Sequence, residues 1–248
     1  KERVLAALRR RPVDYVPCSP FVNPQDFVQR IGRTYQFPFG PSSQEIITYF
    51  VEERGLDMVA SVPWKAHHPE RGVSARVSMK DDIITKTWTT PSGELTASIT
   101  YDEHWPHGFD IPFFTDYTIS RFVRPWLENE QDLACFGHII KPPETSDQLE
   151  HLRFSWHQTK RIADRYDLAT MVSIGTGLTG AQQLADSAKI CLMVVDNPDL
   201  VDAYLELEHE TTMKNYEIAL DFGIDIIRRN GFYESCDFYS PAMLRQFL

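Results

Sequence analysis

Apolar residues recur at helical spacing early in the chain and form short continuous runs between the helical stretches. Helical spacing predicts an opening helix around 4–8 and further helices over 23–32 and 42–55. Continuous apolar runs predict strands over 15–21 and 56–62. After the opening helix, the predicted order is therefore β-α-α-β.

The pattern changes near Gly72, where apolar and polar residues begin to alternate. Alternation over 73–77, 83–88 and 95–99 predicts antiparallel strands joined by short polar turns. We interpret 73–101 as an inserted β-hairpin layer. The following stretch is rich in proline, histidine and aromatic residues, and it predicts little regular structure up to about residue 145.

Regular alternation of strands and helices then returns. A capping box of Thr145 and Gln148 opens a predicted helix. Further elements are predicted as a strand over 168–174, a helix from about 181, a long helix over 197–223, a strand over 225–229 and a helix from 240. Strands that alternate with helices favour a parallel sheet or barrel.

Charge and composition exclude several classes of function. The 248 residues carry a formal net charge of −10, and no basic stripe interrupts it, so we expect no nucleic-acid partner. The longest aliphatic run, 190–195, is far shorter than a membrane helix needs, and the first residues lack an apolar signal core. The four cysteines are widely spaced, which fits reduced thiols and a cytoplasmic location.

A glycine motif follows the strand predicted at 168–174. Gly175, Gly177 and Gly180 satisfy G-x-G-x-x-G, and Asp196 lies 21 residues after Gly175, as in dinucleotide-binding proteins. However, a helical stripe continues through 190–195, and a new helix starts directly afterwards. The crossover then contains two helices and no second strand. The loop is either an anion site at a helix N-terminus or a tight strand-to-helix turn.

Five stretches carry a family resemblance in their order and spacing. They are KERVLAALRRRPVDYVP, TPSGELT, ADRYDLATMVSIGTGLTG, DNPDLVDAYLEL and GIDIIRRNGFYESCDFYSPAMLRQFL. Together they resemble the uroporphyrinogen decarboxylase superfamily, which includes cobalamin-dependent methyltransferases. The resemblance implies an α/β fold, a (β/α)8 TIM barrel with a small antiparallel insertion after its second strand. Residues 1–248 would then form about the first half of one barrel domain and stop after the fourth barrel strand.

Within that superfamily, the chain resembles the methyltransferase branch more than the decarboxylase. The decarboxylase has an arginine-rich segment after its first strand, where this chain has SPFVNPQDF. It also has an acid after the second strand, where this chain has Trp64, and a tyrosine after the third, which is absent here. The methyltransferase branch implies a zinc-bound thiolate site from the second half of the barrel. We therefore expect zinc but no metal ligands within 1–248.

Chemistry in such barrels gathers at the carboxyl ends of the strands, so candidate residues are sought there. We predict catalytic roles for Glu234 and Tyr233, and for His67 or His68 as an acid or donor, with a solvated loop as the alternative for the histidines. Predicted substrate-binding residues are Asn23, Trp64, Gly175, Gly177, Cys236 and Asp237. Asn23 also fits a helix N-cap.

The resemblance implies methyl transfer to or from a corrinoid (cobalamin), held by a partner protein, with a small-molecule methyl donor. A porphyrinogen decarboxylase, a lyase of porphyrin biosynthesis, is the alternative. A non-catalytic barrel that binds a tetrapyrrole or a partner is a further alternative. The oligomeric state stays open, with a homodimer as one option.

Overall fold

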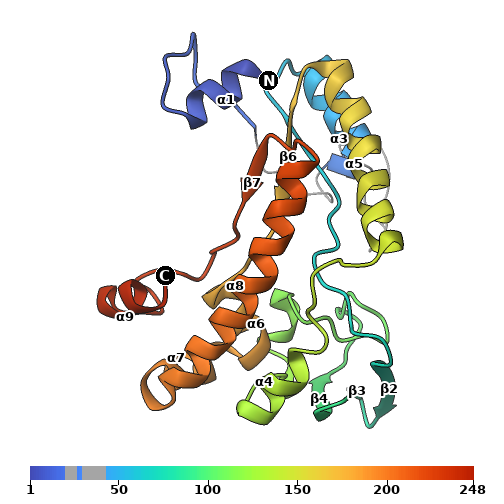
Figure 1. Cartoon of the computed structure of the whole chain (residues 1–248), viewed down its shortest axis with the longest axis vertical. Helices are drawn as coiled ribbons and strands as arrows, with labels where there is room; N and C mark the ends of the chain where they lie inside the picture. The colour runs from blue at the N-terminus through green and yellow to red at the C-terminus, as the bar shows by residue number, and fades with distance from the viewer. Residues whose placement is uncertain (20–26, 30–42) are drawn as a thin grey trace. The chain divides into compact units, whose positions relative to one another are not determined.

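The computed structural model describes residues 1–19, 27–29 and 43–248 (Figure 1). It divides the chain into two compact units, each built from three separate segments. The first unit comprises Lys1–Lys65, Glu144–Ser173 and Tyr216–Arg228, and the second comprises Ala66–Pro143, Ile174–Asn215 and Arg229–Leu248.

A parallel sheet forms the centre of the first unit. Its strands are β1 (Val59–Ser61), β6 (Ala169–Ser173) and β7 (Ile226–Arg228), with β6 in the middle. The prediction of parallel strands separated by helices is thereby confirmed for these three. Neighbouring parallel strands are common to barrels and open sheets, so the barrel itself stays a prediction.

Helices pack on this sheet. They are α1 (Glu2–Leu8), α3 (Ser43–Thr48), which continues into the π-helical turn η1 (Tyr49–Glu53), and α5 (Ser146–Tyr166). The predicted capping box of α5 is present: Thr145 Oγ1 accepts from the Gln148 amide, and the Gln148 side chain accepts from the Thr145 amide. The apolar face of α5 packs with α3 and the sheet, around Ile47, Met58, Ala60, Ala163 and Leu168.

An antiparallel sheet and a group of helices make up the second unit. The sheet has the order β2 (Ser74–Lys80), β3 (Ile83–Thr90), β4 (Gly93–Thr100) and β5 (Phe122–Arg124). A short 3₁₀ turn, η2 (Asp116–Thr118), and α4 (Glu130–Phe136) follow β4. The remaining helices are α6 (Leu178–Ala185), α7 (Ser187–Asp196), α8 (Pro198–Asp221), whose last residues belong to the first unit, and α9 (Pro241–Phe247).

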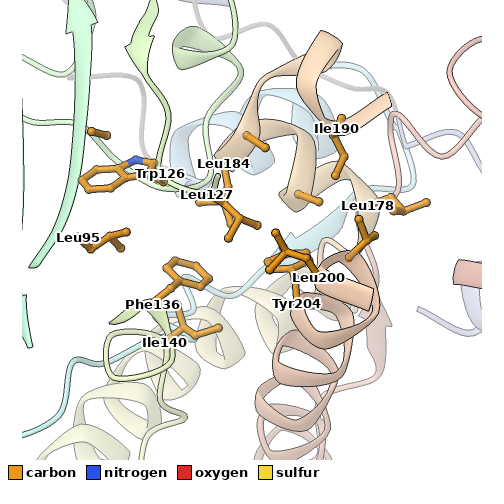
Figure 2. Close-up of a cluster of buried hydrophobic side chains, with 14 of the residues drawn as sticks. Leu95, Trp126, Leu127, Phe136, Ile140, Leu178, Leu184, Ile190, Leu200 and Tyr204 are labelled. Carbon is orange, nitrogen blue, oxygen red and sulfur yellow. The ribbon is translucent and has the colours of Figure 1, made fainter. Parts of the chain in front are cut away.

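One apolar core joins this sheet to these helices (Figure 2). Leu95 of β4, Phe136 of α4, Leu184 of α6 and Tyr204 of α8 contribute to it. The backbone amide of Trp126 donates to the carbonyl of Leu184 over 2.8 Å, so the segment after β5 is fixed to α6. Leu178 at the start of α6 and Tyr204 of α8 both belong to this core, so the core packs the start of α6 against α8.

Two sequence predictions are corrected. Residues 15–19, the described part of the strand predicted at 15–21, are irregular. Pro17 has no amide to donate, and the Tyr15 amide binds the Asp14 carboxylate instead of a neighbouring strand. The stretch up to 145 also contains more order than predicted, because β5 and α4 form there. Most of the helix predicted over 23–32 lies outside the described residues.

Within the described ranges, no helix combines the length and the apolar character that a membrane crossing requires.

Candidate functional site

The loop that follows β6 depends on glycine for its backbone and for its close contacts. Gly175 has φ +86°, and Gly177, the N-cap of α6, has φ +53° and ψ −131°. A Cβ built on Gly177 would collide with the Arg229 guanidinium and would lie 2.5 Å from Oε1 of Glu234. Only glycine therefore allows these two side chains to lie against the loop.

Arg229 and Glu234 form a bidentate ion pair beside this loop. Arg229 directly follows β7, and its two terminal nitrogens donate to the two carboxylate oxygens of Glu234, Nη2 to Oε1 over 2.6 Å. The amide of Leu178, the first residue of α6, also donates to Oε1 of Glu234, over 3.0 Å. The carboxylate side chain is 6% exposed, and the guanidinium is 41% exposed.

The N-terminus of α6 contacts a negatively charged group, the side-chain carboxylate of Glu234. Unbonded amides and the helix dipole favour a negative charge at the start of a helix. Here the chain's own carboxylate takes that place. The helices α6 and α7 follow each other without an intervening strand, as expected, and Asp196 is exposed at the end of α7. The glycine motif therefore has the local sequence of a dinucleotide-binding loop. Within the described residues, it lacks the second strand that would follow α6 and place an acid at the ribose.

Helix α8 also contacts this loop. The carboxylate of Glu208, which is buried, accepts hydrogen bonds from the Thr176 amide over 2.7 Å and from Thr212 Oγ1 over 3.2 Å. Tyr204, one turn earlier, is fully buried. Burial and then the nearby Glu208 charge raise the pKa of Tyr204 well above its ordinary value. A Cβ on Gly180 would collide with Thr176 and Tyr204, so this glycine is also required by packing.

The Tyr233 side chain connects the site to η2. Its backbone amide donates to Thr179 Oγ1 over 3.0 Å, which fixes the residue at the first turn of α6. Burial raises the pKa of Tyr233, and the charge of Asp116 and a hydrogen bond to it raise the pKa further. Asp116 in turn accepts from Gln183 Nε2 over 2.7 Å. Tyr233 is therefore a phenol that stays protonated at neutral pH.

A cavity of about 560 Å³ adjoins the loop. Its polar lining includes Gly177, Glu208 and Arg229, with Asp202, Glu206 and His209 from the exposed side of α8. A small polar ligand in this cavity would contact the guanidinium that the Glu234 carboxylate orients.

The other predicted residues lie elsewhere. Trp64 packs on Phe222 in the first unit, with 5.9 Å between ring centroids. The ring of His67 packs on Phe114, and burial, followed by the neighbouring His68, lowers the pKa of His67 to about 4. His68 is buried and pairs through its backbone with Lys141.

The structure thus brings together four of the predicted residues. Gly177, Tyr233 and Glu234 meet at the start of α6, and the Gly175 carbonyl accepts from the Asn230 amide over 2.9 Å. No described contact joins the two histidines to Glu234. Cys236 and Asp237 are exposed, and Asp237 accepts from Ser235 Oγ over 3.2 Å. Asn23 lies outside the described residues.

Sequence reasoning missed Arg229, Thr176, Tyr204, Glu208 and Asp116. One signal was available, because Tyr204, Glu208 and Thr212 recur every four residues and place polar groups along one face of a long helix. The partners of Arg229 and Asp116 depend on tertiary contacts that no local pattern specifies. In the part of the chain that the structure describes, no group of three or more His, Cys, Asp or Glu residues could hold a metal ion.

The fold and the site define a mixed α/β protein in which the loops after two parallel strands share a buried carboxylate. No protein-family model matches the chain, and no curated protein matches it. Among solved structures, the chain is similar to a methyltransferase from Methanosarcina mazei, with 19% sequence identity and a TM-score of 0.49. That match covers all of this chain and 63% of the methyltransferase chain. A likeness this distant does not define an activity for the chain.

Proposed function

We propose that the chain belongs to an enzyme that transfers a methyl group to or from a corrinoid, with the glycine loop and Glu234 in its active site. The ordered family resemblance of five segments supports the class of reaction. One structural observation supports the location: the Glu234 carboxylate is held by Arg229 and the Leu178 amide beside a polar cavity. Residues that follow parallel strands are where α/β enzymes of this type place their chemistry.

The chemistry of methyl transfer assigns roles to these side chains. A nucleophile attacks the methyl carbon, and the bond to the donor atom breaks as the new bond forms. The departing donor atom takes the electron pair and needs a hydrogen-bond donor. Tyr233 is a protonated phenol, and its O–H can supply this bond once it turns from Asp116 to the donor atom. Arg229, oriented by Glu234, can bind a carboxylate of the donor or an amide side chain of the corrinoid.

Zinc, which the family resemblance implies, would take its ligands from the second half of the barrel. The described residues contain no group of three or more His, Cys, Asp or Glu that could hold a metal ion, so no step of this proposal runs through a metal.

The test is methyl transfer to cob(I)alamin by the purified protein, followed by the visible spectrum of the corrin as methylcob(III)alamin forms. Methanol, methylamines and methoxylated aromatics serve as donors. We expect turnover with at least one donor class and a loss of about 10²-fold or more in Glu234→Gln, because the charge that orients Arg229 is removed. Glu210→Gln, an exposed residue of the same helix as Glu208, is the control and should keep full activity.

Two results would overturn the proposal. One is carbon dioxide release from a porphyrinogen without methyl transfer, which supports the decarboxylase alternative. The other is tight cobalamin binding by folded protein that transfers no methyl group from any donor, which supports the non-catalytic alternative.

A further inference from the structure

A second hydrogen-bonded group of reactive side chains lies in the second unit and shares no residue with the glycine loop. Ser92 Oγ lies 2.9 Å from Nε2 of His138, and Nδ1 of His138 lies 2.7 Å from Oε2 of Glu70. Ser92 occupies the turn between β3 and β4, His138 follows α4, and Glu70 precedes β2. The three side chains therefore form a serine–histidine–carboxylate chain through the two different ring nitrogens.

The charges around Glu70 set the direction of these hydrogen bonds. The hydrogen bond with His138 lowers the pKa of Glu70, and the hydrogen bond with Lys141, whose Nζ lies 3.2 Å from Oε1, lowers it further. An ionised carboxylate can only accept, so Nδ1 of His138 carries the proton. In the neutral imidazole, Nε2 is then the acceptor for the Ser92 hydroxyl. This is the proton arrangement that a serine nucleophile requires.

The main chain of each of the three residues makes a further hydrogen bond that does not involve that residue's own side chain. The Glu70 amide donates to the His138 carbonyl over 2.9 Å, and the neighbouring His68 and Lys141 exchange two backbone hydrogen bonds. The Ser92 amide donates to Thr90 Oγ1 over 3.2 Å. Preorganisation of this kind keeps a nucleophile and its base at reacting distance without ligand.

We propose that Ser92 is an activated nucleophile that takes the acyl group of small esters. Ser92 Oγ attacks the ester carbonyl carbon as its proton passes to Nε2 of His138. The carbon–alkoxide bond then breaks, and the leaving alcohol takes that proton from His138. Water attacks the acyl-serine and gives a proton to His138, and the carboxylic acid leaves as Oγ regains its proton. The sum is hydrolysis of one ester by one water. Ser92 is partly exposed, so a small ester can reach Oγ from solvent.

The test is labelling of the purified protein with a fluorophosphonate, with the modified residue located by peptide mass spectrometry. In this reaction the Oγ–phosphorus bond forms, the phosphorus–fluorine bond breaks, and the serine proton is taken by His138. We expect a label on Ser92 whose rate falls by about 10²-fold or more in His138→Gln, the usual contribution of a general base. Glu70→Gln keeps the size of the residue and should slow labelling less severely.

Ser98→Ala is the matched control, because Ser98 lies on β4 and its hydroxyl pairs with Thr85 rather than with a histidine. Ser98→Ala should label at the wild-type rate. Hydrolysis of p-nitrophenyl acetate gives a second readout that should fall in Ser92→Ala. Circular dichroism and thermal unfolding establish that each variant is folded. No label on Ser92, or a label whose rate is unchanged in folded His138→Gln, would overturn the proposal.

Discussion

The carboxylate of Glu234 lies 3.0 Å from the amide nitrogen of Leu178, the first residue of α6. A residue that follows β7 therefore caps the helix that follows β6, and two successive loops of the chain are joined at one charged group. Arg229 donates to both oxygens of the same carboxylate. The glycine motif therefore binds a carboxylate of the same chain, that of Glu234.

Replacing Glu234 by glutamine should weaken this junction. Glutamine keeps the size of the residue and one acceptor oxygen, but it removes the charge that two N–H groups of Arg229 and one amide share. We expect the free energy of unfolding to fall by about 1.5–3 kcal/mol, the range for hydrogen bonds to a charged group. Urea unfolding measures this change. Glu210→Gln, with an exposed side chain on α8, should stay within about 0.5 kcal/mol, and an equal effect of the two changes would contradict the prediction.

Substitution of Gly177 by alanine should be more destabilising than the same change at Gly223. Both glycines have positive φ, but a Cβ on Gly223 meets no atom within 4 Å, whereas one on Gly177 collides with Arg229 and Glu234. Gly223→Ala measures backbone strain alone, about 1–2 kcal/mol. We expect Gly177→Ala to cost about 1–3 kcal/mol more than Gly223→Ala, because the ends of Arg229 and Glu234 must move away and their hydrogen bonds at the loop are lost.

Thermal or urea unfolding of both variants gives the comparison directly. If Gly177→Ala loses no more stability than Gly223→Ala, the close approach of Arg229 and Glu234 to the loop is wrong.

The elements that the sequence predicts correctly have strong local signals. The capping box at Thr145 and the Asn197-Pro198 start mark α5 and α8 to within a residue or two. By contrast, β5 has only three residues and exists because it pairs with β4, which no local pattern encodes. Helix α4 has an N-cap, because Asn129 Oδ1 accepts from the Asp132 amide, but it lies in an aromatic and proline-rich stretch that hides its short apolar face.

The same distinction applies to the site. The sequence predicts Glu234 because it closely follows a predicted strand, next to other reactive residues. The pairing of Arg229 with Glu234 depends on how the loop after β7 folds back, which no local pattern specifies. Glu208 lies 32 residues from Thr176, so only the packing of α8 on the loop could show their hydrogen bond.

Replacing Asp116 by asparagine should lower the pKa of Tyr233. Burial is the largest cause of the raised pKa, and the charge and hydrogen bond of Asp116 are the others. We therefore expect Tyr233 in Asp116→Asn to titrate closer to an ordinary tyrosine while staying above it. NMR titration of ring-labelled tyrosine measures the change, and Tyr233→Phe assigns the signal. An unchanged pKa in folded Asp116→Asn would show that Asp116 does not act on the phenol.

Acid should destabilise the protein through His67. Burial and the neighbouring His68 lower the pKa of His67 from 6.5 to about 4. Between these pH values the unfolded chain binds a proton that the folded chain does not. The free energy of unfolding therefore rises with pH through this window and gains nothing more from His67 above about pH 6.5. The His67 residue keeps some exposure to solvent, which weakens the effect of burial on its charged form. We therefore expect His67 to contribute about 1–3 kcal/mol to the free energy of unfolding.

His67→Phe keeps a ring against Phe114 and removes the titrating group. Comparison of urea unfolding at pH 4.5 and pH 7 should show a smaller loss of stability at acid pH in this variant than in the wild type, because its folded state no longer excludes a proton. His157→Gln, at an exposed position of α5, should keep the wild-type loss. If His67→Phe loses as much stability at acid pH as the wild type, the environment of His67 does not disfavour its charged form. The histidine is then better described as part of a solvated loop.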